Sequence, residues 1–248
     1  MSLLAVEGLT VRARDETTLL DDVSLSIDAE ETVLLAGPSG SGKTLLGKAI
    51  AGLLSPVSTV SVDGTVHREG TVGMCFQDPR TQLVRERVRS DVAFGLENRG
   101  VAPAEIHDRI DDWADRLDAV HLLDREITAL SRGETTLVAL LGTLVTEPDL
   151  VVLDEPLAAL DARNRRLVLD AIEELHGETA LFVAEHDAKP VLELADRAIL
   201  LEEGEIGANG SPRAVVGSLH EAGIEVPFAT AVALARGDPA ESVPLSGG

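Results

Sequence analysis

The sequence is poor in cysteine and lysine. Its single cysteine, Cys75, cannot form a disulfide within the chain. Lysine occurs only at Lys43, Lys48 and Lys189, whereas Asp and Glu number 43, and the formal net charge is −22. Because phosphate contacts need clustered Lys and Arg, this balance argues against nucleic acid as a partner. A salt-rich cytoplasm would screen so acidic a surface, and an ordinary acidic surface is an equal alternative.

Long apolar runs and a secretion signal are also missing. The longest apolar run, at residues 137–145, is interrupted by Gly142 and is too short to cross a bilayer. The first seven residues have no basic segment ahead of an apolar one, so we expect a cytoplasmic protein. The hydrophobic fraction of 44% over 248 residues is enough for a core in one large domain or two small ones.

The chain does contain a glycine-rich segment between two apolar patterns. An apolar run at residues 32–36 comes before it, and a helical stripe follows it at Leu45, Leu46, Ala49, Ile50 and Leu53. Strand, Gly-rich loop and helix in this order are typical of a P-loop, whose backbone N–H groups surround a phosphate. A plain Gly/Ser loop is the weaker alternative. The candidate phosphate-binding residues are Gly37, Pro38, Ser39, Gly40, Ser41, Gly42, Lys43 and Thr44.

Lys43 and Thr44 have separate expected tasks in this loop. Lys43 is placed to reach the outer phosphates, and the Thr44 hydroxyl can bind Mg²⁺. The segment therefore predicts a site for a nucleoside triphosphate with its magnesium ion.

The first third of the chain predicts strands on either side of the P-loop. Residues 4–14 alternate with Val6, Leu9 and Val11 inward, and residues 21–28 alternate with inward positions at Val23, Leu25 and Ile27. After the P-loop helix, Pro56 ends the helical pattern. Residues 59–66 then predict a β-hairpin around Asp63-Gly64.

Residues 90–147 have a helical character and separate two groups of strands. Their apolar residues repeat at helical spacing and predict core stripes at Ile106, Ile110, Trp113 and Leu117, and at Leu137, Leu140, Leu141 and Leu144. Apolar runs at 71–76, 150–153 and 180–183 predict strands, with a helix at 163–175. Apolar strands that alternate with helices indicate a parallel sheet covered on both faces.

Polar residues follow these strands, where a parallel sheet places its ligands. Asp154, after one apolar strand, suits the Mg²⁺ shell through water, and Glu155 could orient or deprotonate an attacking water. His186 could hydrogen-bond a γ-phosphate. Gln77 is neutral and can touch the metal or the water without adding charge. The alternatives are a helix start at Asp154-Glu155-Pro156 and a solvated loop at His186.

These motifs give the chain a resemblance to the ATP-binding subunits of ABC transporters. The resemblance extends from about residue 4 to residue 215 and rests on residues 37–44, Gln77, residues 130–134, residues 153–156, Leu160-Asp161 and His186. Within that family the chain is similar to the ATPases of energy-coupling factor (cobalt-type) vitamin and metal importers. The narrower likeness rests on residues 76–79, Gln82-Leu83, residues 91–98 and residues 185–187.

The resemblance implies an α/β fold with a P-loop NTPase core. It would have a mixed, mainly parallel sheet, an N-terminal antiparallel β portion and an inserted helical subdomain. The implied division is a core at 1–80 and 150–217, a helical subdomain at 81–149 and a C-terminal extension at 218–248. Within that extension, residues 229–234 have a helical pattern, and the Gly-, Pro- and Ser-rich end is expected to be loose.

The resemblance also implies an ATPase with ATP and Mg²⁺ as ligands and a second ATPase chain as partner. The partner, identical or related, would form a head-to-tail dimer with two ATPs between the chains. Each site would join one P-loop to the other chain's signature at Ser131 and Gly133, with Asp161 nearby. Ser131-Arg132-Gly133-Glu134 is also a capping box. Integral membrane transport subunits would place the protein on the inner face of the cell membrane.

Three departures from the family pattern are visible. Arg132 and Glu134 stand where the family signature has Gly and Gln, which leaves a weakly hydrolysing partner subunit of a heterodimer as the alternative function. The aromatic that stacks on adenine is replaced near Ala13, so Arg12 or Arg14 would lie on the base. The helix after Asp161 is arginine-rich, and we interpret its arginines as a solvated face. They are Arg163, Arg165 and Arg166.

Overall fold

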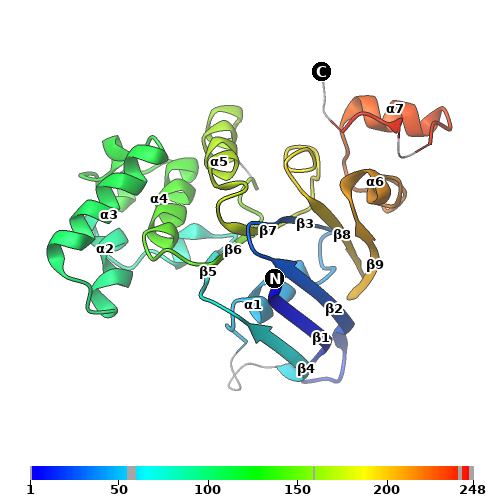
Figure 1. Ribbon diagram of the computed structural model, residues 1–248, viewed down its shortest axis with the longest axis horizontal. Helices are drawn as coiled ribbons and strands as arrows, with labels where there is room; N and C mark the ends of the chain where they lie inside the picture. The colour runs from blue at the N-terminus through cyan, green and yellow to red at the C-terminus, as the bar shows by residue number, and fades with distance from the viewer. Residues whose placement is uncertain (1, 55–59, 159, 240–241, 246–248) are drawn as a thin grey trace.

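The structure is a computed structural model that describes residues 2–54, 60–158, 160–239 and 242–245. Its strands form a three-stranded sheet in the order β2-β1-β4 and a six-stranded sheet in the order β5-β6-β7-β3-β8-β9 (Figure 1). The small sheet consists of β1 (Ser2–Ala13), β2 (Thr18–Asp28) and β4 (Val60–Arg68). The large sheet consists of β3 (Thr32–Ala36), β5 (Val72–Cys75), β6 (Leu150–Asp154), β7 (Ala180–Glu185), β8 (Arg197–Glu202) and β9 (Glu205–Gly210).

The helices surround the large sheet. They are α1 (Lys43–Ile50), α2 (Val88–Asn98), α3 (Pro103–Arg116), α4 (Arg132–Leu144), α5 (Ala162–Leu175), α6 (Pro212–Glu221) and α7 (Phe228–Ala235). Short 3₁₀ turns are η1 (Pro79–Thr81), η2 (Val120–Leu122) and η3 (Ile127–Ala129). In Figure 1, α1 lies beside the small sheet, α2, α3 and α4 group at one end, and α5, α6 and α7 lie on the opposite side of the large sheet.

The large sheet is buried on both faces, and alternate residues of its strands enter two separate cores. Leu35 and Phe182 pack toward α1 and the small sheet. Leu34, Val151 and Val183 pack toward α4, α5 and α6 on the other face. Five strands run parallel and β9 pairs antiparallel with β8. The expected α/β class, with a mainly parallel sheet, an antiparallel β portion and inserted helices, is therefore confirmed.

The expected hairpin at residues 59–66 is wrong. Residues 60–68 form one continuous strand, β4, which pairs antiparallel with β1. The register shifts between Glu7 and Thr10 of β1, where Gly8 and Leu9 lie opposite Gly64 alone, so β1 carries a bulge and Asp63-Gly64 continues the strand across from it instead of turning. Gly64 has φ 92°, and a Cβ there would come within 2.4 Å of the Gly8 carbonyl oxygen. Thr59 and Pro56 lie outside the described residues.

Two apolar positions are less buried than the sequence pattern indicated. Helix α1 ends at Ile50, and Leu53, beyond it, is exposed. Trp113 packs against the core only in part, and the Arg116 guanidinium lies 4.4 Å from its ring centroid. The expected buried positions in β1, in β2 and along α4 are confirmed.

Part of the chain's end packs against the rest of the protein. The helix expected at residues 229–234 is α7, and Val243 beyond it is fully buried. The Val243 carbonyl accepts a hydrogen bond from Arg213 Nη1 at 2.6 Å, so the expected loose end is wrong for residues 242–245. Residues 246–248 lie outside the described part. Helix α6 crosses the boundary expected after residue 217.

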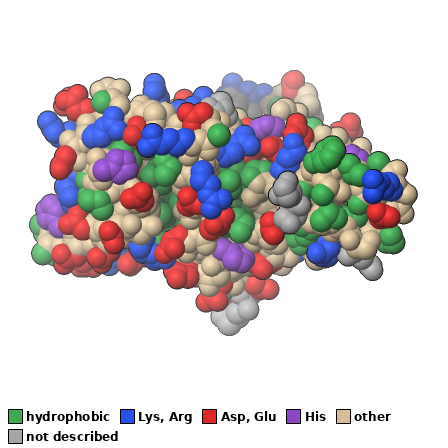
Figure 2. All heavy atoms as spheres, turned by 90° about the horizontal axis from the view of Figure 1, so that it is seen from above, with side chains coloured by type: hydrophobic (Ala, Val, Ile, Leu, Met, Phe, Trp, Pro, Cys, Tyr) green, Lys and Arg blue, Asp and Glu red, His purple; other side chains and the backbone are tan. Residues whose placement is uncertain are grey.

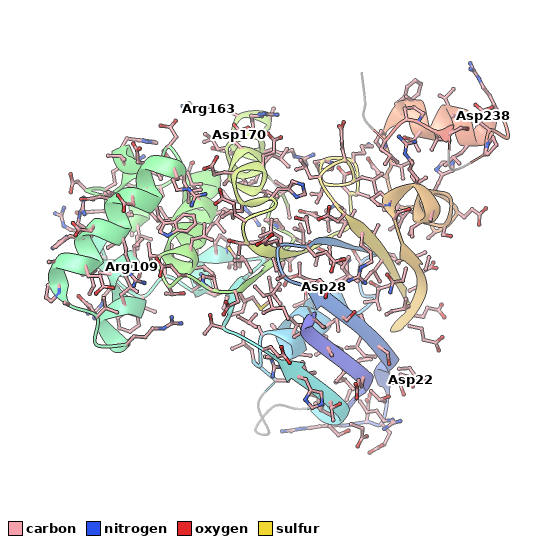
Figure 3. The ribbon with its side chains drawn as sticks, in the orientation of Figure 1. Asp22, Asp28, Arg109, Arg163, Asp170 and Asp238 are labelled. Atoms are coloured by element: carbon pink, nitrogen blue, oxygen red, sulfur yellow. The ribbon has the colours of Figure 1, made fainter. Side chains whose placement is uncertain are left out.

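Charged side chains of both signs are interspersed on the face that Figure 2 shows, and hydrophobic side chains gather at the end that carries α7. On α5, Arg163 is exposed and Arg166 pairs with Asp170 at 2.7 Å, which confirms the solvated arginine face (Figure 3). No helix among the described residues has the length and apolar character that a bilayer-spanning segment needs. Burial raises the pKa of the Cys75 thiol to about 12, so this thiol stays protonated and inert.

Candidate functional site: a phosphate loop at the sheet edge

The P-loop lies at the carboxyl end of β3, where α1 begins. Gly42 is the residue before α1 and has φ 105°, a conformation that favours glycine. A Cβ on Gly42 would lie 2.7 Å from Leu20 Cδ2, so a side chain is also excluded by space. No side chain caps α1, and its first backbone N–H groups therefore remain available to an anion.

Two buried side chains of the loop fit a bound phosphate. The Lys43 side chain is 4% exposed, and its Nζ donates to the carbonyl oxygens of Gly37 at 2.8 Å and Pro38 at 3.1 Å. Ser41 Oγ is buried and has no hydrogen-bond partner among the described residues. A buried hydroxyl without a partner is costly unless a ligand satisfies it, so the loop fits the phosphate that its sequence predicts.

The expected magnesium ligands meet beside the loop. Thr44 Oγ1 donates to Asp154 Oδ1 at 3.0 Å, and a cavity beside them is also lined by Gln77. Burial raises the pKa of Asp154, against the opposing effect of the Thr44 hydrogen bond. Among the described residues, no group of three or more His, Cys, Asp or Glu side chains could hold a metal by itself. Phosphate oxygens would therefore have to complete a Mg²⁺ shell built on Thr44 and Gln77.

Glu155 lies at the centre of the remaining polar groups. Gln77 Nε2 donates to Glu155 Oε2 at 2.6 Å, and Lys43 Nζ lies 3.7 Å from Glu155 Oε1. His186 Nδ1 is 3.9 Å from Glu155 Oε2. The Glu155 backbone has φ 47° and its N–H donates to the Ala184 carbonyl at 2.8 Å, which turns the chain out of β6. The four groups expected on one rim are thus brought together.

The cleft beside the P-loop has a volume of about 720 Å³. Its lining also includes Thr17 from the β1–β2 turn, Thr18 and Leu19 at the start of β2, and Glu203. Ala13 lies at the start of this turn, and its N–H donates to the Thr17 carbonyl at 2.8 Å. Arg12, one of the two arginines expected to lie on the base, instead pairs with Asp63 at 3.1 Å. The sequence pattern had not identified the two threonines.

The signature segment does not line the P-loop cleft, although Arg132 lines a second cavity together with Gln77. Ser131 caps α4: its Oγ accepts from the Glu134 N–H at 3.3 Å, and Glu134 Oε2 accepts from the Ser131 N–H at 2.7 Å. Arg125 Nη1 also lies 2.7 Å from Glu134 Oε1. The expected capping box is therefore present. The Ser131 N–H bond, helped by Arg125, lowers the pKa of Glu134 and keeps it ionised.

Asn164 joins the signature helix to Asp161. The Asp161 side chain caps α5 by accepting from the Asn164 N–H at 2.8 Å and from Asn164 Nδ2 at 3.1 Å. Gly133 packs so closely on Asn164 that a Cβ at position 133 would lie 2.2 Å from the Asn164 Cβ. Ser131, Gly133 and Asp161 therefore form a second group, and none of the three lines the P-loop cleft of the same chain.

Comparisons with known proteins agree with this geometry. The family model described as ABC transporter matches residues 20–158. An ABC transporter ATP-binding protein of Halobacterium salinarum is 42% identical over 236 residues, which cover 91% of this chain and all of that protein. The energy-coupling factor transporter ATP-binding protein of Halalkalibacterium halodurans is 38% identical, over 88% of this chain and 82% of its own length.

A solved structure extends the likeness to the fold. The structure of cbiO1 from Clostridium perfringens, part of the ABC transporter complex cbiONQ, has a TM-score of 0.75 and 30% identity. The match covers 87% of this chain and 90% of that one. The likeness to energy-coupling factor ATPases is therefore confirmed together with the wider resemblance. The chain belongs to the ATP-binding proteins of ABC transporters, the ATPases that couple ATP hydrolysis to transport.

Proposed function

We propose that this chain dimerises around two MgATP and powers an importer of the energy-coupling factor type, for a vitamin or a metal ion. The observation that carries the proposal is the convergence of Lys43, Thr44, Asp154, Glu155 and His186 on one edge of the sheet. Because no helix among the described residues can span a bilayer, integral membrane subunits would form the path for the substrate. The chain would lie against them on the inner face of the cell membrane.

Each residue of the cluster has a separate task in hydrolysis. Lys43 binds the outer phosphates, Thr44 and Gln77 would hold Mg²⁺, and Asp154 would reach the ion through water. The ion, when bound, neutralises negative charge on the phosphates. Glu155 orients or deprotonates the attacking water, and His186 donates a hydrogen bond to the γ-phosphate. Gln77 already donates to Glu155 at 2.6 Å, so it can align the carboxylate and the metal together.

The separation of the two groups supports a site made from two chains. Ser131 and Gly133 start a helix whose N-terminus is an anion site, yet they do not line the P-loop cleft of their own chain. In a head-to-tail dimer they would face the phosphates bound by the partner. The division into a core, a helical subdomain at 81–149 and an extension at 218–248 is part of this proposal.

The weakly hydrolysing partner subunit is the less favoured alternative. It rests on Glu134, which could bring negative charge toward a γ-phosphate. Glu134 instead turns back to the Ser131 N–H and pairs with Arg125 at 2.7 Å, so its charge is balanced locally. Arg132, the neighbouring departure, is exposed at the helix N-terminus and adds a positive charge there.

A composite site makes the specific activity depend on protein concentration. If each site needs residues from two chains, the ATPase rate per chain should rise with chain concentration until dimers dominate. Steady-state phosphate release, measured over a hundredfold range of protein at saturating MgATP, tests this expectation. A rate per chain that stays constant down to concentrations where light scattering finds only monomers would refute the composite site.

The protein should discriminate only weakly between ATP and GTP. Stacking on an aromatic contributes roughly 1–3 kcal/mol, about one to two factors of ten in affinity, and Ala13 provides none. We therefore expect ATP to be preferred over GTP by less than a hundredfold, and Ala13→Tyr to tighten ATP binding. Steady-state rates with both nucleotides in high salt measure the preference. Ala13→Leu is the matched control, because it adds bulk without a ring. A preference of the wild type for ATP above a hundredfold would mean that Thr17, Thr18 or Glu203 selects adenine.

A further inference from the structure

The proposed mechanism uses only one of the two buried carboxyl groups at this edge of the sheet. Asp154 and Glu185 are 2% and 1% exposed, and they end the neighbouring strands β6 and β7. Asp154 belongs to the expected Mg²⁺ site. Glu185 has no task in that site, although it directly precedes His186. Burying a carboxyl group is costly unless it is compensated, so Glu185 needs an explanation.

Glu185 connects the turn after Glu155 to the imidazole of His186. Its Oε1 accepts a hydrogen bond from the Leu157 N–H at 3.0 Å, which attaches it to the turn that carries Glu155. Its Oε2 lies 3.7 Å from His186 Nδ1. The distance is slightly too long for a hydrogen bond, but catalytic contacts commonly shorten when a site closes on its substrate.

The other charged groups near His186 are already engaged. Glu155 Oε2, at 3.9 Å from the same Nδ1, receives the Gln77 amide at 2.6 Å. Asp187 lies 3.6 Å from Arg165 Nη1 and accepts from the Lys189 N–H at 3.1 Å. Glu185 is therefore the carboxyl group best placed to hold Nδ1.

The surroundings of Glu185 favour a retained proton. Burial, against the opposing Leu157 N–H and with the negative charges of Glu155 and Asp187, raises the pKa of Glu185 to about 7. Near neutral pH a carboxyl group with this pKa is partly protonated, and its O–H can then donate to the ring nitrogen beside it.

We propose that Glu185 is a positioning residue that shares one proton with His186 Nδ1 and thereby keeps a hydrogen on Nε2. When the proton is on Glu185, its O–H donates to Nδ1, and the neutral ring carries its hydrogen on Nε2. When the proton is on Nδ1, the ring is cationic and Nε2 again carries a hydrogen. Both states present an N–H donor on the side of the ring away from Glu185. That this donor serves a γ-phosphate rests on the proposed function.

The tautomer of His186 can be measured directly. Nitrogen NMR of histidine-labelled full-length protein distinguishes the two ring tautomers, and loss of the signal in His186→Ala assigns it. We expect the Nε2–H form in the wild type and in Glu185→Gln, whose amide can donate to Nδ1 while its oxygen accepts from Leu157. Glu185→Leu should give a mixture. Glu193→Gln, at an exposed glutamate that does not shift the pKa of Glu185, is the matched control and should leave the tautomer unchanged. An Nδ1–H neutral ring in the wild type would overturn the proposal, whatever the Leu variant does.

The rate of ATP hydrolysis gives an independent test, because it distinguishes a role of Glu185 through His186 from a general loss of stability. Glu185→Leu should lower kcat about tenfold with little change in KM, and should have no further effect in a His186→Ala background. Glu185→Gln should stay within about threefold of the wild type. An equal tenfold loss in the His186→Ala background would mean that Glu185 acts only on stability. If the wild type hydrolysed no ATP, the proposed function would fail, and the NMR result would still decide the role of Glu185.

Discussion

Replacing Lys43 by alanine is expected to weaken MgATP binding at least about a hundredfold. Hydrogen bonds to charged groups contribute roughly 1.5–3 kcal/mol each, and the ammonium group can reach more than one phosphate oxygen. The fold should survive, because the loop's conformation is set by its glycines and by β3 and α1. Titration with a fluorescent ATP analogue measures the affinity, and circular dichroism reports the fold.

Lys189 provides a matched control for this experiment. It is one of three lysines, and its ammonium pairs with Glu225, away from the residues that line the P-loop cleft. Lys189→Ala should therefore bind the analogue like the wild type. Equal affinities for the wild type and Lys43→Ala would show that nucleotide binds elsewhere.

Glu155→Gln is expected to lower hydrolysis by about 100- to 10,000-fold while leaving MgATP binding intact. Removal of a general base costs a factor of this size, and glutamine keeps the shape of the side chain. Nucleotide that binds but is not consumed stabilises the dimer, so light scattering should find a dimer in MgATP and a monomer without it. Phosphate release measures the lost rate.

The control is Glu147→Gln. Glu147 also has a left-handed backbone, with φ 49° against 47° for Glu155, but it lies on the surface and pairs with Arg109 at 2.9 Å. The Glu147→Gln variant should hydrolyse ATP at the wild-type rate. Hydrolysis by Glu155→Gln at that same rate would exclude Glu155 as the base.

Most of the site could be predicted because each of its residues follows a strongly apolar strand. Parallel strands place their carboxyl ends at one edge, so Asp154, Glu155 and His186 were expected together, and the hydrogen bond from Thr44 to Asp154 places them beside the P-loop. Glu185 was named only within residues 185–187 and received no role, because its burial and its contact with Leu157 depend on a turn distant in sequence. Arg125 was missed because its contact with Glu134 crosses a loop whose path the sequence does not determine.

The fold was predictable where periodicity was strong and uncertain where glycine allowed two conformations. Asp63-Gly64 is a good hairpin signal, but a glycine with positive φ is also tolerated inside a strand opposite a bulge, and pairing with the bulged strand β1 decided the outcome. The packed end around Val243 was also missed. A segment rich in Gly, Pro and Ser carries little periodic signal, and Val243 is buried by contacts with parts of the chain far away in sequence.

The strand order of the large sheet has a consequence for how the protein is made. Strand β3, which leads into the P-loop, pairs on one side with β7, where Thr32 faces Leu181, and on the other with β8. These neighbours leave the ribosome about 150 residues after β3, and pairing over such a separation is slow because a long loop must close first. The P-loop is therefore synthesised well before β7 and β8, the two strands that hold β3 in the sheet.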